Sequence, residues 1–143
     1  MIPRTVLVAC GPFDDLSAGR VGSAISRGLA AGGLESDLCP IALEHPRPAD
    51  VRELLASLHF DTRMRAARAV VVGQWHLEES TLAASPAFEI ATRARQAGVP
   101  AYAVTAENAL GPFDARILDL QAIIEASGPR ALAAAGRRLG TLV

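Results

Sequence analysis

The sequence predicts a three-layer α/β fold, in which a doubly wound parallel sheet of about five strands has helices on both faces. The first observation is a set of short apolar, β-branched runs, of which Val70, Val71 and Val72 are the clearest because no polar residue interrupts them. The second is that these runs alternate with longer segments of helical periodicity. The connections between them are short, about two to six residues, as is typical of right-handed βαβ units.

The first third of the chain predicts a strand, a helix and a second strand. Residues 5–9 (TVLVA) form an apolar run that ends at Cys10, Gly11 and Pro12. Ser17 can cap a helix whose small and apolar residues recur at intervals of three and four, closing at residues 32–33 (GG). A second strand is expected around residues 36–41, where Pro40 suits a sheet edge or a strand end.

The middle third predicts a helix, the most strongly buried strand and another helix. Pro46, Pro48 and Asp50 mark a helix start, and the apolar face that follows either continues or breaks near residues 59–61. The third strand is expected over residues 69–72, with Gly73 stopping it sharply. Helical spacing then runs over residues 79–97, and Gly98 provides the C-terminal cap.

The last third predicts a fourth strand at residues 100–105 and a final helix at residues 129–142. Residues 117–120 fit a fifth strand, although the segment LQAIIEA could instead be helical. We expect the strand order 2-1-3-4-5, a Rossmann-like or flavodoxin-like arrangement, within a single domain over residues 1–143.

Composition excludes several classes of partner. The 14 basic and 15 acidic residues nearly cancel, no block of like charge appears, and we expect neither nucleic acid nor a membrane as a partner. All the basic residues are arginine, so the chain offers no lysine for gripping a phosphate or forming a Schiff base. Cys10 and Cys39 lack a metal-like spacing, and we interpret them as buried thiols in a reducing cytoplasm.

The candidate site lies where the loops after the first and third strands meet, because ligands bind at the switch point of an open α/β sheet. His76 and Glu78 could form an acid/base pair, and Asp14 or Asp15 could hold a metal or a substrate hydroxyl. The catalytic candidates are Asp14, His76 and Glu78. The loop after the fourth strand adds polar groups. Expected ligand-binding residues are Gly11, Phe13, Asp14, Asp15, Ser17, Gly73, Gln74, Trp75, His76, Thr105 and Asn108.

Each of these loops also has a purely structural interpretation. Asp15 and Ser17 could merely cap the first helix, and Trp75 could simply cover apolar surface. The loop after the third strand supplies too few ligands for a metal, and His45 and His59 are too scattered to form a zinc site, so we predict no metal and interpret both histidines as ordinary surface residues. No nucleophile-elbow motif supports a hydrolase.

The same two loops resemble those of the bacterial glycerate kinase family. The first matches the family start A-P-D-S-F-K-G-S-L-S-A, and the second matches an apolar strand followed by G-E-G-R-L-D and T-L-A-G-K. The family's charged residues differ here, since Gly11 and Asp14 replace an aspartate and a lysine. The matching residues are Ala9, Phe13, Leu16, Ser17, Ala18, Gly73, Leu77, Thr81, Leu82 and Ala83.

The resemblance covers only the family's doubly wound domain, without its inserted second domain. For the family it implies phosphoryl transfer from ATP with Mg²⁺ to D-glycerate. With the charged groups altered, it implies for this chain a non-catalytic module that binds a small molecule or anion and self-associates as a homo-oligomer. The alternative is an ATP-dependent kinase of glycerate or a related hydroxy acid that needs a partner chain. No cofactor is expected except ATP and Mg²⁺ in that alternative.

Overall fold

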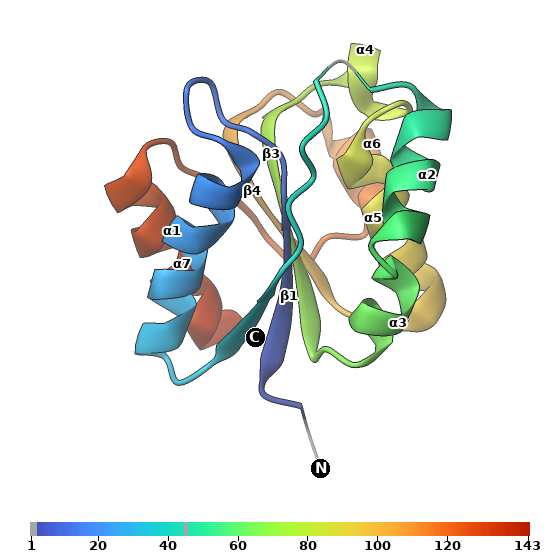
Figure 1. Cartoon of the computed structure of the whole chain (residues 1–143). Coiled ribbons are helices and arrows are strands. Elements are labelled where there is room, and N and C mark those ends of the chain that lie inside the picture. The colour runs from blue at the N-terminus through green and yellow to red at the C-terminus, as the bar shows by residue number, and fades with distance from the viewer. Residues whose placement is uncertain (1–2, 45) are drawn as a thin grey trace.

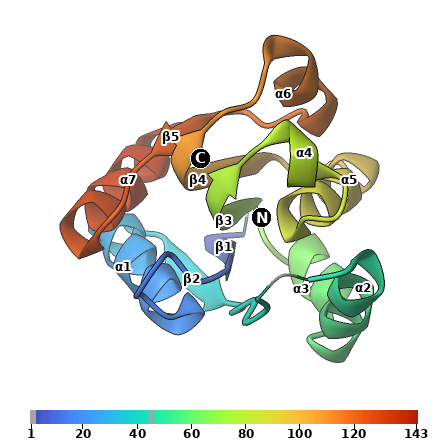
Figure 2. The same cartoon turned by 90° about the horizontal axis from the view of Figure 1, so that it is seen from above.

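A five-stranded parallel sheet forms the middle layer of the protein, whose computed structural model describes residues 3–44 and 46–143 (Figure 1). The order β2-β1-β3-β4-β5 confirms the predicted topology, and the view from above shows the strands side by side in that sequence (Figure 2). His45, which the sequence analysis interpreted as an ordinary surface residue, lies outside the described residues. The strands are β1 (Thr5–Cys10), β2 (Glu35–Leu38), β3 (Ala69–Leu77), β4 (Ala101–Asn108) and β5 (Ile123–Glu125).

Helices cover both faces of the sheet, as the doubly wound prediction requires. On one face, α1 (Ala18–Ala31) and α7 (Pro129–Leu142) enclose one apolar core, and on the other α2 (Pro48–Ser57), α3 (Phe60–Arg65) and α5 (Pro86–Ala97) enclose a second (Figures 1 and 2). The short helices α4 (Glu79–Leu82) and α6 (Pro112–Leu118) follow the carboxyl ends of β3 and β4. No helix in the described part of the chain has the length and apolarity needed to cross a bilayer.

The first core depends on unusually close contact between α1 and α7. A Cβ added at Gly28 would overlap the carbonyl oxygen of Ala133 and lie 2.5 Å from the nitrogen of Arg137, and one added at Gly136 would overlap the carbonyl oxygen of Ile25. Two glycines therefore allow the two backbones to touch. This contact brings the helix after β5 against the helix after β1 and closes that face of the sheet.

The third strand is longer than predicted. Gly73 does not stop it, and β3 continues to Leu77, pairing with β4 as far as Asn108. The reason is that Gly73 pairs with Cys10, whose Sγ would lie only 2.5 Å from a Cβ at that position. The glycine is therefore needed for close approach of β1 and β3, and is not a strand terminator.

Two further predictions about helices and strands are wrong in position. The helix predicted over residues 79–97 is two helices, since Ser85 caps a new helix by accepting a hydrogen bond from the Phe88 nitrogen at 3.2 Å, and Pro86 occupies the first helical position. The fifth strand is not at residues 117–120, where α6 ends, but at residues 123–125. Neither the strand predicted at residues 117–120 nor the alternative helix over LQAIIEA matches this strand, because a strand of three residues shows no periodicity.

The other predicted helices and strands are present, although some of their ends differ from the prediction. Ser17 caps α1 and the helix ends at Gly32, while Gly98 follows α5 with a φ of 71°. The helix begun at Pro48 breaks at His59, whose φ of 53° turns the chain into α3. Both cysteines are buried free thiols, as expected.

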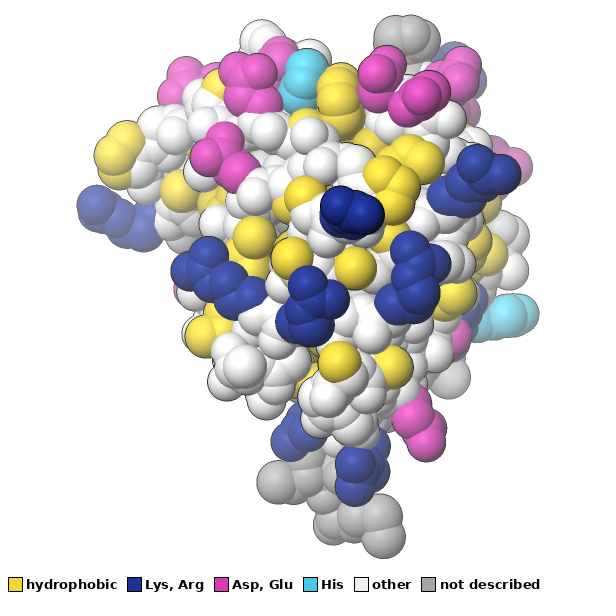
Figure 3. All heavy atoms as spheres, turned by 90° about the vertical axis from the view of Figure 1, so that its left-hand side faces the viewer, with side chains coloured by type: hydrophobic (Ala, Val, Ile, Leu, Met, Phe, Trp, Pro, Cys, Tyr) yellow, Lys and Arg dark blue, Asp and Glu magenta, His cyan; other side chains and the backbone are white. Residues whose placement is uncertain are grey.

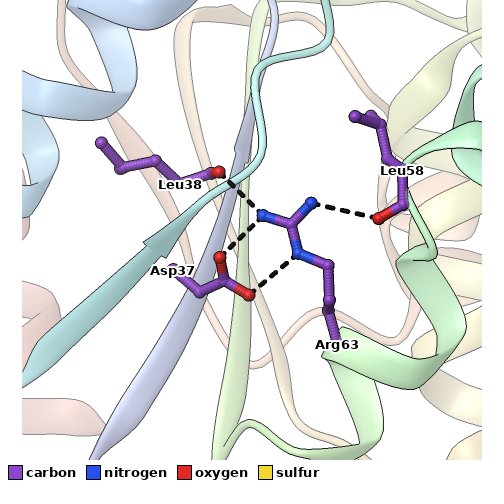
Figure 4. A network of polar contacts seen from close by, with 4 residues as sticks. All are labelled: Asp37, Leu38, Leu58 and Arg63. Atoms are coloured by element: carbon purple, nitrogen blue, oxygen red, sulfur yellow. Dashed lines mark hydrogen bonds and ion pairs between the residues drawn. The ribbon is translucent and has the colours of Figure 1, made fainter.

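One arginine fastens the edge strand β2 to the helical layer. The Arg63 guanidinium donates to both carboxylate oxygens of Asp37, at 3.0 and 2.7 Å, to the Leu38 carbonyl at 2.8 Å and to the Leu58 carbonyl at 3.1 Å (Figure 4). The hydrogen bond to Asp37 raises the pKa of Arg63. Since β2 is at the sheet edge, as Pro40 indicated, this network satisfies an edge carbonyl that otherwise faces solvent.

Candidate functional site

A cavity of about 830 Å³ opens at the carboxyl edge of the sheet, where β1 and β3 lie side by side. The chain leaves β1 toward the α1 face and leaves β3 toward the α5 face, so this is the switch point of the doubly wound sheet. Residues from the ends of β1 and β3, the segment after β2 and the α4–α5 segment line the cavity. The sequence analysis predicted a ligand site at this same switch point, between the loops after β1 and β3.

The floor of the cavity is backbone without bulky side chains. Gly11 donates a hydrogen bond to the Gly73 carbonyl at 2.8 Å, which continues the β1–β3 pairing into the site. Gly11 and Gly73 both line the cavity, and Cys10 fills the space where a Cβ of Gly73 would lie. Behind Gly73, burial raises the pKa of the Cys10 thiol to about 12, which keeps it a neutral core group.

Trp75 and His76 provide the aromatic surface of the cavity. Their rings are stacked at 4.9 Å with an interplanar angle of 23°, and Trp75 also meets Phe13 edge-on at 5.7 Å. Because β3 continues past Gly73, both residues belong to a hydrogen-bonded strand whose position is fixed by β4. The neighbouring Gln74 joins this strand to α5, since its amide nitrogen donates to the His76 carbonyl at 3.1 Å and its oxygen accepts from the Ala87 nitrogen at 3.0 Å.

The loop after β1 is a tight turn with two carboxylates at its tip. Phe13 and Leu16 exchange two backbone hydrogen bonds of 2.9 and 2.8 Å, and the turn between them places Asp14 at a φ of 50°. Asp14 is exposed and lines the cavity, and Asp15 is exposed beside it. Ser17 accepts a hydrogen bond from the Arg20 nitrogen at 3.3 Å and so caps α1, the structural role considered for it.

The predicted site residues therefore fall into two groups. Phe13 is buried in the α1–α7 core, Thr105 is fully buried and donates to the Trp75 carbonyl at 3.1 Å, and Asn108 accepts from the Leu110 nitrogen at 3.2 Å. These three, with Asp15 and Ser17, are outside the cavity lining. The residues that the structure brings together around the cavity are Gly11, Asp14, Gly73, Gln74, Trp75 and His76.

The catalytic candidates do not form a compact triad. Nδ1 of His76 lies 3.5 Å from Oε1 of Glu78, close enough for an ion pair when the imidazole is protonated, but Glu78 lies beyond the cavity lining. Asp14 comes from the opposite loop. In the described parts of the chain, no group of three His, Cys, Asp or Glu side chains has a geometry that could hold a metal ion.

The sequence analysis missed two segments that complete the cavity. Ile41, Leu43, Glu44 and Pro46 follow β2, and the α4–α5 segment contributes Ser80, Thr81 and residues 84–86. The signal for the first was available, because the segment after β2 also follows the carboxyl end of a parallel strand. The second was hidden by the prediction of one continuous helix over residues 79–97.

The cavity edge is acidic. Asp14 and Glu44 are its charged lining residues, and no arginine lines it among residues 3–44 and 46–143. Figure 3 views the α1–α7 face and shows acidic side chains gathered along the upper edge of the molecule, with basic side chains lying below them. The helices of this face contain five exposed arginines and no acidic residue, so charge is separated along the molecule. These arginines are Arg20, Arg27, Arg130, Arg137 and Arg138.

Comparison with known proteins places this architecture among the flavodoxin-like folds. No protein-family model and no curated protein sequence matches the chain. A solved structure of the diflavin flavoprotein A3 from Nostoc sp. matches 99% of this chain and 94% of its own, with a TM-score of 0.51 and 16% identity. A flavone reductase matches 95% of this chain and 60% of its own, with a TM-score of 0.51 and 15% identity. A flavodoxin-like domain from Synechococcus sp. gives a TM-score of 0.45 with 18% identity, covering 95% of this chain and 93% of its own.

The resemblance to glycerate kinases, and the module or kinase function inferred from it, is therefore wrong. Flavodoxin-like structures match nearly the whole chain, and no family model supports the kinase assignment. The physical reason is that the shared residues serve the fold: Ser17 caps a helix, Gly73 permits close strand approach and Leu77 is buried in the core. Any doubly wound sheet can require such residues at these places.

Proposed function

We propose that the cavity at the β1–β3 edge binds a planar heteroaromatic small molecule of the flavin type. Among sheets of order 2-1-3-4-5, the β1–β3 switch point is the place where flavodoxin holds its flavin. One matching structure supports the choice of ligand, because it is a diflavin flavoprotein by name. A bound flavin would supply one- and two-electron transfer.

The observation that carries the proposal is the stacked pair of Trp75 and His76 beside a floor of two glycines. An aromatic side chain favours stacking against a flat ring, and Trp75 is held in place by Phe13 behind it. Gly11 and Gly73 both line the cavity beside this pair. A cavity of about 830 Å³ is also in the range of natural small-molecule sites.

Titration with riboflavin tests this proposal directly. Trp75 is the only tryptophan of the chain, so quenching of tryptophan fluorescence reports on the cavity itself. Trp75→Ala should weaken binding by about fivefold or more, and Trp75→Phe should recover part of the loss, because stacking contributes about 1 kcal/mol or more. Because both variants lack the only tryptophan, their binding is followed by the fluorescence of riboflavin instead.

The matched control is Phe113→Ala, since Phe113 is an exposed aromatic of α6 outside the cavity lining. This variant should bind riboflavin as the unmodified protein does. Circular dichroism checks that every variant remains folded. Absence of binding of both riboflavin and FMN by the folded protein would refute the proposal, and an equal loss in Phe113→Ala and Trp75→Ala would refute the location.

Two further expectations concern the surroundings of the protein. We expect a cytoplasmic location, because both cysteines are free thiols. We also expect self-association through an exposed sheet edge, of which β5 is the less covered candidate because Arg63 occupies the β2 side. Analytical ultracentrifugation measures the oligomeric state, and a monomer at all concentrations would contradict the second expectation.

A further inference from the structure

We propose that the ligand of this cavity has no phosphate group, so that the site takes an uncharged flavin such as riboflavin in preference to FMN; this inference rests on the proposed function. A phosphate at the end of a sheet is ordinarily bound by free N–H groups at a helix N-terminus and by nearby cations. In this protein the groups next to the cavity have the opposite character.

Carboxylates occupy the place where an anion would approach. Asp14 and Asp15 form the tip of the turn between β1 and α1, both are exposed, and Asp14 reaches the cavity. Glu44 faces the same cavity from the segment after β2. A phosphate dianion brought to this edge would meet like charges from two separate segments, and little in the lining offsets the repulsion.

At both neighbouring helix starts, some of the backbone donors that could hold an anion are already used. At the start of α1, the nitrogen of Arg20 donates to the Ser17 hydroxyl. At the start of α5, Pro86 has no N–H, the nitrogen of Ala87 donates to Gln74 at 3.0 Å, and the nitrogen of Phe88 donates to Ser85 at 3.2 Å. The first three residues of α5, beside the cavity, therefore have no backbone N–H left for an anion.

No arginine among the described residues lines the cavity. Arg47, next to the lining residue Pro46, is paired with Asp50, and Arg63 is held by Asp37. The aromatic and glycine surfaces that suit a ring are unaffected by this charge distribution. The cavity therefore favours binding of the FMN ring and disfavours binding of its phosphate.

Riboflavin and FMN form a matched pair of probes, because they differ only by the phosphate. At low ionic strength we expect riboflavin to bind at least about tenfold more tightly than FMN, a preference that shrinks with added salt as the exposed charges are screened. Both affinities are measured by fluorescence quenching of the purified protein. Equal or tighter binding of FMN would overturn this inference and leave the proposed function standing, whereas absence of binding by both flavins would overturn both.

The double variant Asp14→Asn/Asp15→Asn tests the cause. Asparagine keeps the side-chain size and tolerates the positive φ of Asp14, so the turn should persist. We expect the affinity for FMN to rise relative to that for riboflavin by about threefold or more. Glu35→Gln is the control, since Glu35 is an exposed acid at the other end of the sheet, and it should change neither affinity. An unchanged ratio of the two affinities in the double variant would refute the role given to these carboxylates.

Discussion

The contact between α1 and α7 gives the sharpest prediction about stability. Gly28→Ala places a methyl on the carbonyl oxygen of Ala133, 2.5 Å from the nitrogen of Arg137 and 2.7 Å from the carbonyl carbon of Gly136. All three are backbone atoms, so no side-chain rotation relieves the overlap and the helices must move apart. Overpacking of this kind costs about 3 kcal/mol. The better helix propensity of alanine offsets about 0.5–1 kcal/mol.

The expected net loss of unfolding free energy is about 2 kcal/mol, equivalent to a fall in Tm of about 4–8 °C for a domain of this size. Urea unfolding followed by circular dichroism measures it, and the midpoint should fall with an unchanged m value. Gly22→Ala is the matched control in the same helix, because its nearest neighbours are side chains at 3.6 and 3.8 Å. It should stabilise by about 0.5 kcal/mol. Equal stability of Gly28→Ala and the unmodified protein would refute the close-contact explanation, as would an equal loss in Gly22→Ala.

Three further changes test other parts of the structure. Gly73→Ala should destabilise by about 1–3 kcal/mol in urea unfolding, because its methyl would press on the Cys10 sulfur, and adding Cys10→Ala should recover part of the loss. Arg63→Met should cost about 1–3 kcal/mol by the same assay, since it leaves Asp37 and two carbonyls without their donor; a neutral effect would show the network to be dispensable. Burial raises the pKa of Cys10 to about 12, so above about pH 9 the unfolded chain releases a proton that the folded protein retains. The free energy of unfolding should then fall with rising pH by about 1.4 kcal/mol per pH unit for this thiol. Cys10→Ala should remove this slope, and a slope that persists in Cys10→Ala would show that another group causes it.

The order of the strands could be predicted from the sequence, because apolar β-branched runs and the helices between them leave few alternatives. The ends of the elements could not. Gly73 has the local character of a breaker, and only its register opposite Cys10 explains why the strand passes through it. Residues 117–120 are as apolar as a strand, yet Leu118 is the last residue of α6 and packs against Leu82 and Ala91, a contact between segments distant in sequence.

For the candidate site, the position followed from the topology, whereas the role of each side chain depended on its surroundings. Trp75 and His76 reach the cavity from the last residues of β3, and Asp14 reaches it from the turn after β1. Phe13 has the same position in the sequence pattern but turns into the core, where it meets Trp75 edge-on. The two backbone hydrogen bonds between Phe13 and Leu16 fix that orientation, and they have no signature in the sequence.

The glycerate kinase prediction was wrong because the matching residues serve the fold and do not determine the chemistry of the site. Residues such as Ser17, Gly73 and the valines of β3 are required by capping, close approach and burial between two cores, whatever ligand the sheet binds. Matches at such positions therefore carry information about the fold and little about chemistry. The informative positions are those that the fold leaves free, and at the cavity these are the exposed Asp14 and the half-buried Trp75 and His76. An aromatic surface beside an acidic edge favours a flat, uncharged ligand, and the paired affinities for riboflavin and FMN measure that preference directly.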